Sequence, residues 1–501
     1  MTALSFGDLP PEILSEILGF LDAKVLLLCS SVCKLWHDTV EGSPELQYTI
    51  ELWADGMICG PSSGVLTHTE TLEALYKKRR AWKHLEWTSK TVVEFQPLVF
   101  CRAYELVAGL FVQQKEGPDF LAISLPRTVD EPQASRDIYS MGTNLQNFED
   151  FAIDPTQDLI VRFYTPPGEL AYLECRTLSF QEPHPLVSND VLAFLLDRDP
   201  IGPFSMQVAD DIIGIFFLQA PFSFKLFNWR VGITITELRD QEIGAPLPVV
   251  GFHLLSPRSY IFAHTSFGLG NAGQIDIYAF DGERANHPTH VATLELPKLL
   301  PKTYITTLII QAGPFCAQPI FGTPFSKSNE HRIYMLLIRY GIATPGNWYR
   351  LFVHYRWFHK YVLDHRRGET KFAPVVPWDE WGPQNSRMLP GENYQWNRHI
   401  HGERVALPCP HYDFRAMRII DFGIIPKRIL ASGISHPLEP TVLEQDGVFE
   451  DIVTTSLPYT STVRLLDEKY DLFLLDQDRI IAMDTSESVT NYHERVAVYT
   501  F

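Results

Sequence analysis

From about residue 90 to its end, the sequence repeats one pattern: an apolar run, a turn, and a second apolar run rich in aromatic residues. Short apolar runs bounded by Gly, Pro, Asn and Asp are typical of strands in hairpins. The pattern returns about every 45–60 residues, without sequence identity between its copies. The clearest copies occupy residues 158–180, 211–232, 259–282, 332–358 and 471–501.

Recurrent hairpins over about 400 residues require an architecture that protects the edges of their sheets. Radial repetition of small sheets does this, so the pattern predicts a β-propeller. The markers of the common propeller repeats are absent, because there is no periodic Gly-His…Trp-Asp pattern and the pair Trp378-Asp379 stands alone. Two packed β-sandwiches would give the same pattern and are the alternative.

Composition and charge narrow the class of protein. The chain has 501 residues, of which 45% are hydrophobic and 20% charged, so it contains ample material for a buried core. Its formal net charge of −18 argues against a nucleic-acid partner, because such proteins carry a basic footprint. The longest uncharged stretch, residues 303–326, is interrupted by prolines and therefore predicts strands and turns instead of a membrane span.

The sequence also lacks the features of secretion. Its N-terminal residues include no basic segment, and Asp8, Glu12 and Glu16 interrupt the apolar run that a signal peptide requires. The seven cysteines form no Cys-x-x-Cys pair, which fits reduced thiols. We therefore expect a protein of the cytoplasm, the nucleus or both, without a membrane partner.

The first 60 residues have the spacing of short helices. Pro10 and Pro11 can begin a helix at little cost, because the first amides of a helix have no intrahelical partner. Ile13, Ile17 and Leu21 then recur on one stripe of that helix. The first helix is therefore expected to be amphipathic.

Two more helices are expected after the first. Asp22 can cap a helix over residues 23–29, and Ser30 or Ser31 can cap another over 32–41. Three short helices are marginal in water, and a domain of about 50 residues buries only part of its surface. Either the rest of the chain or a partner must cover the remaining apolar side chains.

This segment resembles the F-box. The resemblance rests on the run Leu9-Pro10-x-Glu12-Ile13, on the leucine-rich second helix and on Val32-Cys-Lys-x-Trp36. F-boxes dock onto a Skp-type adaptor within a cullin-based ubiquitin ligase, and the rest of the chain captures a target protein. The resemblance implies an adaptor-binding surface made of Leu9, Pro10, Glu12, Ile13, Ile17, Leu18, Leu21, Leu26, Val32 and Trp36.

The sequence thus predicts an α+β chain of several domains. A small three-helix F-box is expected over residues 5–50, a connecting helix over 68–88, and a large, mainly β domain with a propeller architecture over 90–501. The β-rich part resembles the C-terminal region of large fungal F-box proteins in its alternation of short apolar runs and turns, without a shared motif. The implied function is that of a substrate-recognition adaptor. A non-degradative F-box scaffold and a carbohydrate-binding or carbohydrate-active propeller with a helical cap are the alternatives.

The predicted helix over residues 68–88 carries a basic run, Lys77-Lys-Arg-Arg80. Such a run would suit a nuclear-localisation patch, and it equally suits the solvated face of a helix. Leu72, Leu75 and Trp82 recur at helical spacing and are expected to pack inward.

Signatures of catalysis, metal binding and cofactor binding are weak. The G-x-S-x-G, P-loop and H-E-x-x-H motifs are absent. The glycines of residues 268–273 match G-x-G-x-x-G, but a strand-like run follows where a dinucleotide site needs a helix. Another group of potential ligands comprises His399, His401, Cys409 and His411. The spacing of these residues is compatible with zinc ligands, yet the sequence does not repeat a ligand pattern that would complete such a site. We expect a non-catalytic chain with neither metal nor cofactor.

Overall fold

The computed structural model divides the chain into two compact units. A helical unit is formed within residues 1–88 and 318–331 together with Phe501, and a propeller unit within residues 89–317 and 332–500. The structure describes residues 9–61, 66–95, 103–114, 119–125, 134–138, 148–168, 170–196, 203–218, 223–239, 248–265, 270, 272–341, 347–370, 372–394, 396–424, 438–443, 447–485 and 494–501.

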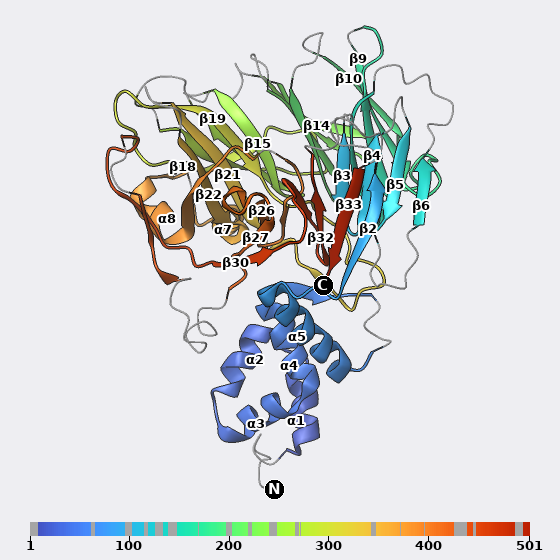
Figure 1. Ribbon diagram of the computed structural model, residues 1–501, viewed down its shortest axis with the longest axis vertical. Helices are drawn as coiled ribbons and strands as arrows, with labels where there is room; N and C mark the ends of the chain where they lie inside the picture. The colour runs from blue at the N-terminus through green and yellow to red at the C-terminus, as the bar shows by residue number, and fades with distance from the viewer. Residues whose placement is uncertain are drawn as a thin grey trace. The chain divides into compact units, whose positions relative to one another are not determined.

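The propeller unit is built from four-stranded antiparallel blades, seven of them among the described residues. Each blade is a sheet of its own, and the first strands of neighbouring blades contact one another, as β7 contacts β3 and β11. The first strand of each blade is therefore the inner one. We call the strands A to D from the inside outward, so that strand A is the inner strand, strands B and C are the middle strands and strand D is the outer strand. Figure 1 shows the blades as successive groups of arrows along the colour gradient.

Six blades follow the order of the chain, and β23 (Val375–Val376) is added in parallel to one of them. Their strands are β3 (Tyr104–Val107), β4 (Leu110–Gln114), β5 (Phe120–Ser124) and β6 (Ala134–Ile138); β7 (Phe148–Asp154), β8 (Leu159–Tyr164), β9 (Leu170–Thr177) and β10 (Val191–Leu195); β11 (Phe204–Ala209), β12 (Ile212–Phe217), β13 (Ser223–Asn228) and β14 (Ile233–Arg239); β15 (Val249–Ser256), β16 (Ser259–His264), β17 (Gln274–Ala279) and β18 (Thr289–Glu295); β19 (Tyr304–Gln311), β21 (Ile333–Gly341), β22 (Asn347–His354) and β24 (Ser386–Gly391); β25 (Ile400–His401), β26 (Arg404–Pro408), β27 (Ala416–Asp421) and β30 (Thr460–Leu465). A separate hairpin pairs β28 (Thr441–Leu443) with β29 (Val453–Thr455).

The seventh blade joins strands from the two ends of the propeller unit. It consists of β31 (Leu472–Leu475), β32 (Arg479–Met483), β33 (Glu494–Thr500) and, as its outer strand, β2 (Ser89–Phe95). In Figure 1 the blue strand β2 lies beside the red strand β33. The ring is thus closed by hydrogen bonds between the first and last segments, which removes a free sheet edge.

The middle strands of the blades are buried on both faces. Every residue of β13 and of β16 is buried, and so are the first five residues of β12. Because neighbouring blades cover both faces, β12 and most of β16 carry continuous apolar runs instead of alternating ones.

The predicted propeller is confirmed, and the sandwich alternative is wrong because each group of strands forms its own blade. The predicted hairpins correspond to β8–β9, β12–β13, β16–β17, β21–β22 and β31–β33. The sequence did not reveal the blades that contain β4–β5 and β26–β27. Its pattern therefore identified the middle strands of five blades.

The expected strand over residues 348–358 is wrong in its second half. β22 ends at His354, and α7 (Tyr355–Arg366) begins at the next residue. Tyr355, Phe358 and Val362 are buried on one side of this helix, at spacings of three and four residues. A second helix, α8 (Trp378–Asn385), also places buried aromatic rings against the same core.

Strand direction alternates within a blade, so the A–B and C–D connections lie at one end of the propeller, which we call the A–B end. The B–C connections and the links between blades lie at the other end, the B–C end. Ser89 begins β2 opposite Thr500 at the end of β33, and both residues lie at the A–B end. Residues 312–332, between β19 and β21, are an A–B connection as well.

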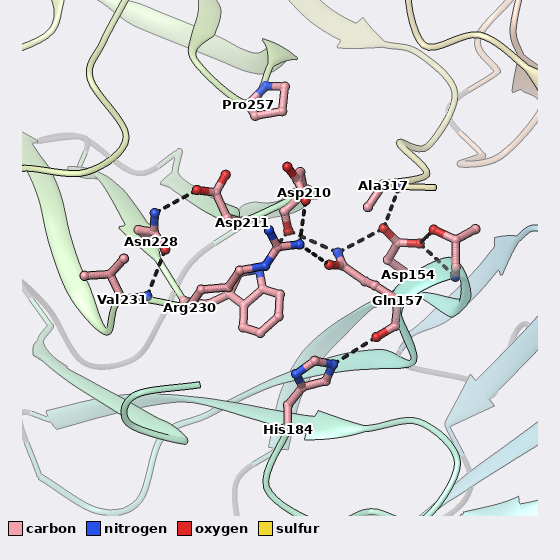
Figure 2. A network of polar contacts seen from close by, with 12 residues as sticks. Asp154, Gln157, His184, Asp210, Asp211, Asn228, Arg230, Val231, Pro257 and Ala317 are labelled. Carbon is pink, nitrogen blue, oxygen red and sulfur yellow. Dashed lines mark hydrogen bonds and ion pairs between the residues drawn. The ribbon is translucent and has the colours of Figure 1, made fainter. Parts of the chain in front are cut away.

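Polar side chains join neighbouring blades at the A–B end. Figure 2 shows Arg230, from the β13–β14 connection, between Asp210 and Gln157. Arg230 Nη2 donates to Asp210 Oδ1 at 2.6 Å and to Gln157 Oε1 at 2.8 Å. Gln157 belongs to the β7–β8 connection, so this arginine links two blades.

Asp211 extends this network to the next blade, and its removal should destabilise the propeller. This buried carboxylate accepts hydrogen bonds from both terminal nitrogens of Arg258, at 2.7 and 2.8 Å, and from Asn228 at 2.8 Å. We expect Asp211→Ala to lower the free energy of unfolding by about 2 kcal/mol, because Arg258 is partly exposed and regains some hydration.

Denaturant titration of the full chain would measure this effect. Asp281→Ala is the matched control, because Asp281 is exposed and, among the described residues, accepts a hydrogen bond from the Glu283 amide alone. The control should shift the free energy by less than about 0.5 kcal/mol. Equal shifts for both variants would contradict a stabilising role for the network.

The helical unit contains short helices and one two-stranded sheet. Pro11 begins the first helix, Asp22 caps the second and a Thr67–Glu70 capping box begins the last. The elements are α1 (Pro11–Leu18), α2 (Ala23–Ser30), α3 (Lys34–Gly42), α4 (Pro44–Ala54), β1 (Met57–Cys59), α5 (His68–His84) and β20 (Phe325–Lys327).

Local sequence signals located these helices in part. Asp22 Oδ1 accepts from the Val25 amide at 3.0 Å, which confirms the expected cap of the second helix. The expected cap of the third helix is wrong, because the hydroxyls of Ser30 and Ser31 donate to carbonyl groups in the last turn of α2. α3 begins after Cys33 instead, and the sequence did not predict α4.

A segment from the middle of the chain completes the helical unit. β20 pairs with β1, and Phe325 packs into a core with Leu75 and Tyr48. The Gly60 amide donates to the Pro324 carbonyl at 2.9 Å. A Cβ atom at Gly60 would lie 2.0 Å from a backbone oxygen of the same segment, so only glycine permits this close approach.

The last residue of the chain also belongs to the helical unit. The ring of Phe501 stacks on Trp82 of α5, with centroids 4.1 Å apart and an angle of 16°. We expect Phe501→Ala to destabilise α5 by about 1–3 kcal/mol, because the buried indole loses its stacking partner. Hydrogen exchange of residues 68–84 should become faster, whereas Phe180→Ala, an exposed phenylalanine of the propeller unit, should leave it unchanged. Unchanged exchange in Phe501→Ala would contradict this role.

Candidate functional site

Helix α1 separates its apolar side chains onto two faces. Leu14 and Leu18 point into the core of the helical unit, where Leu18 is 2% exposed. Ile13 and Ile17 are 44% and 41% exposed. Because successive residues turn by about 100° around a helix, the pair 13 and 17 and the pair 14 and 18 occupy different faces.

Helix α2 shows the same separation. Leu26 is fully buried, whereas Leu28 is 67% exposed and Val32, just after the helix, is 66% exposed. Val25 and Leu28 lie three residues apart on one face of α2. We call Pro10, Ile13, Ile17 and Phe20 the α1 face, and Val25, Leu28 and Val32 the α2 face.

The core of the helical unit does not need these exposed side chains. It is formed by buried residues from α1 to α4, namely Leu14, Leu18, Ala23, Leu26, Val40, Leu46 and Ile50. The apolar side chains of the α1 and α2 faces are therefore surplus to the fold. Exposed apolar surface of this kind marks an interaction site in soluble proteins.

The residues expected to bind an adaptor fall into three groups. Pro10, Glu12, Ile13, Ile17 and Val32 are exposed; Leu9, Leu21 and Trp36 are partly buried; Leu18 and Leu26 are buried. Leu18 therefore belongs to the core and not to the surface, because it follows Leu14 by one helical turn. Residues 5–8 of the expected domain lie outside the described residues.

The adaptor-binding residues predicted from the sequence do not include three exposed apolar side chains of these faces, Phe20, Val25 and Leu28. Phe20 follows α1 and is the most exposed of the group, and Val25 stands one turn before Leu28. The periodicity of α2 could have separated Val25 from the buried Leu26. The run of leucines around them concealed that signal, because every position in it is apolar.

The third face of α1 lines an acidic groove of about 670 Å³. Glu12 and Glu16 come from α1, Asp38 from α3 and Glu45 from the first turn of α4. The described residues that line this groove include no Lys or Arg. A partner that also covered this groove would need basic or polar groups there.

The basic run on α5 is partly engaged within the helical unit. Arg79 forms ion pairs with Glu51 at 2.5 Å and with Asp55 at 2.8 Å. Lys77 and Arg80 are exposed. The run therefore contains side chains that hold α5 against α4 as well as solvated ones.

The zinc hypothesis gains no support from the described residues. No group of three or more His, Cys, Asp or Glu side chains in this part of the chain is arranged to hold a metal ion. The ring of His399 is buried, which lowers its pKa to about 4, and His411 is exposed in η4 (Pro410–Tyr412). After Gly273 the chain forms β17, a strand and not the helix that a dinucleotide site needs; Gly268 lies outside the described residues.

Comparison with protein families identifies the N-terminal segment. Residues 6–49 match the family of F-box-like domains. No curated protein matches the chain in sequence. None of the described helices combines the length and the hydropathy needed to cross a membrane.

Solved structures similar to the chain include two WD40 domains and Sqt1. The C-terminal WD40 domain of Sif2 matches with 9% identity and a TM-score of 0.37, covering 82% of this chain and 97% of its own. The WD40 domain of SCAP from fission yeast matches with 8% identity and a TM-score of 0.34, covering 82% and 98%. Saccharomyces cerevisiae Sqt1 matches with 7% identity and a TM-score of 0.36, covering 83% and 98%. The chain carries an F-box-like domain at residues 6–49, and a propeller follows it with seven blades among the described residues.

Neighbouring positions of α1 should respond differently to truncation. We expect Leu18→Ala to destabilise the helical unit by about 2–5 kcal/mol, because it opens a cavity in the core. Ile17→Ala should cost less than about 1 kcal/mol, because its side chain is already exposed to water. Hydrogen exchange of residues 11–54 would report both effects. Similar exchange in the two variants would contradict the assignment of the faces.

Proposed function

We propose that the chain is the substrate-recognition subunit of a Skp–cullin–F-box ubiquitin ligase. Its helical unit would dock a Skp-type adaptor, and through it a cullin, while its propeller captures a target protein. The match of residues 6–49 to F-box-like domains supports this assignment. The observation that carries it is the exposure of Ile13 and Ile17 beside a core that is complete without them.

Docking on the α1 and α2 faces would supply a large favourable free energy. Full burial of an aliphatic side chain contributes about 1.5–3 kcal/mol, and these side chains retain a large part of that gain because they are exposed. Association itself costs several kcal/mol, so a stable complex would bury several of these side chains together. Glu12 and Glu16 flank the α1 face and would orient a partner with basic groups.

The chain itself would perform no chemistry. An adaptor of this kind holds a target near a recruited ubiquitin-conjugating enzyme, which raises the effective concentration of the target lysine. A closed ring of blades suits this role, because its connections present binding residues on a rigid scaffold. We place the protein in the cytoplasm, the nucleus or both.

Co-elution with a Skp-type adaptor tests the docking step. We expect the full chain to form a stable complex, and the double variant Ile13→Asp, Ile17→Asp to weaken it by more than about tenfold, because it places charge on the α1 face. Glu73→Gln is the control, since Glu73 is exposed on α5, outside the α1 and α2 faces and the acidic groove. A monodisperse wild-type chain that ignores the adaptor would refute the proposal.

A second measurement separates a ligase subunit from a scaffold. Both would co-elute with the adaptor. Only with a ligase subunit should proteins bound by the propeller become ubiquitinated when the cullin complex, a conjugating enzyme, an activating enzyme, ubiquitin and ATP are added. Stable binding without transfer would favour the non-degradative alternative.

A further inference from the structure

The propeller unit contains a pocket of about 730 Å³ between two neighbouring blades at the B–C end. One blade contributes β22, β24 and the link after β24 to its lining. The other blade contributes β26, β27, β30 and the B–C connection between β26 and β27. The volume lies in the range of about 300–1,000 Å³ that is typical of ligand sites.

Aromatic rings and prolines form much of the pocket wall. They are Pro390, Tyr394, Trp396, Pro408, Pro410, Tyr412 and Phe414. Such residues give a large contact area at a small cost in side-chain entropy. This wall is suited to a partner with apolar side chains.

The connection on one side of the pocket has a fixed shape. Asp413 and Phe414 both adopt left-handed backbone conformations, with φ of 53° and 58°. The Tyr412 amide donates to the Cys409 carbonyl at 3.0 Å, and the Tyr470 amide donates to the Phe414 carbonyl at 2.9 Å. A preformed wall reduces the ordering that binding requires.

Arg350 supplies a cation with unused hydrogen-bonding capacity. It lies on β22, and its Nη2 donates to the Glu392 carbonyl oxygen at 3.0 Å. Its buried Nε finds no acceptor among the described residues. Burial, together with the charge of Arg418, lowers the pKa of Arg350 to about 10, so the side chain remains protonated at neutral pH.

Arg418 is the second cation of the pocket. Its Nε donates to the Ser461 hydroxyl at 2.8 Å. Within the part of the chain that the structure describes, neither Arg350 nor Arg418 forms an ion pair with a carboxylate. The pocket also includes Asp471, whose two oxygens accept hydrogen bonds from the amide and hydroxyl of Thr485. The exposed carboxylate of Glu392 acts on Arg350 only at longer range.

We propose that this inter-blade pocket binds an extended peptide segment of the target protein, with an anionic side chain beside an apolar one. The carboxylate or phosphate would meet the guanidinium groups of Arg350 and Arg418, and the apolar side chain would contact the aromatic wall. Glu392 and Asp471 also line the pocket, but neither pairs with Arg350 or Arg418, so an anion beside the two guanidinium groups would complete their hydrogen bonding. This inference rests on the proposed role of the propeller in target capture.

An array of short randomised peptides tests the proposal on the full-length chain. Each peptide carries glutamate, phosphoserine, serine or lysine at its centre, with leucine or glycine beside it. We expect centres with an anion followed by leucine to bind about tenfold more tightly than those with serine or lysine. A preference for phosphoserine over glutamate would identify phosphate as the source of the charge. Equal binding of the phosphoserine and glutamate peptides would show that the pocket accepts either anion.

Variants of the two arginines connect that binding to the pocket. Arg418→Met should weaken the selected peptides about tenfold, and Arg350→Lys should weaken them too, because lysine keeps the charge but lacks the forked donors. Arg415→Met is the matched control, since Arg415 is exposed on the same connection but does not line the pocket. Thermal melting of each variant would show that the propeller remains folded.

Three outcomes would overturn the proposal. They are equal binding of anionic and neutral peptides, unchanged affinity in Arg418→Met, and selective binding of glycans or oligonucleotides in place of peptides. The same samples are tested for co-elution with a Skp-type adaptor. A chain that binds the adaptor but shows no anionic preference refutes only the pocket, whereas a chain that ignores the adaptor refutes the proposed function.

Discussion

The pairing of β2 with β33 is the interaction on which the rest of the structure depends. It runs from Ser89 opposite Thr500 to Phe95 opposite Glu494 and gives the last blade its outer strand. Without it, both ends of the propeller would present unpaired strands. It also places the first and last residues of the propeller unit, Ser89 and Thr500, opposite each other. The segment that leads from α5 therefore enters the propeller beside the point where the chain leaves it for Phe501.

The helical unit shares this dependence on distant parts of the chain. Its first core uses only residues between Leu14 and Ile50. Its second core needs Phe325 from the β19–β21 connection, and Trp82 needs the last residue of the chain. The α1 and α2 faces belong to the first part, whose packing is local. Docking of an adaptor there would require no residue from outside it.

The sequence predicted the architecture where local signals were strong. Middle strands such as β12 and β16 are buried on both faces, so their apolar runs were visible. The middle strands β4 and β26 have only five residues each and include Gln or Arg, so the blades of β4–β5 and β26–β27 escaped detection. The helix α7 follows β22 without a polar break, which explains why it was taken for a strand. No local pattern could reveal that residues 318–331 belong to the helical unit, because that assignment depends on pairing across the chain. Ile17 and Leu18 are both apolar, so the sequence alone could not tell which side of α1 faces the local core.

Hydrogen exchange of the full chain, alone and with a Skp-type adaptor, tests the central claim most directly. The account predicts that the adaptor protects the exposed segments of α1 and α2 and leaves the blades unchanged, because the apolar faces of those helices are surplus to the fold. Protection confined to the propeller, or no protection in a mixture at saturating adaptor, would contradict it.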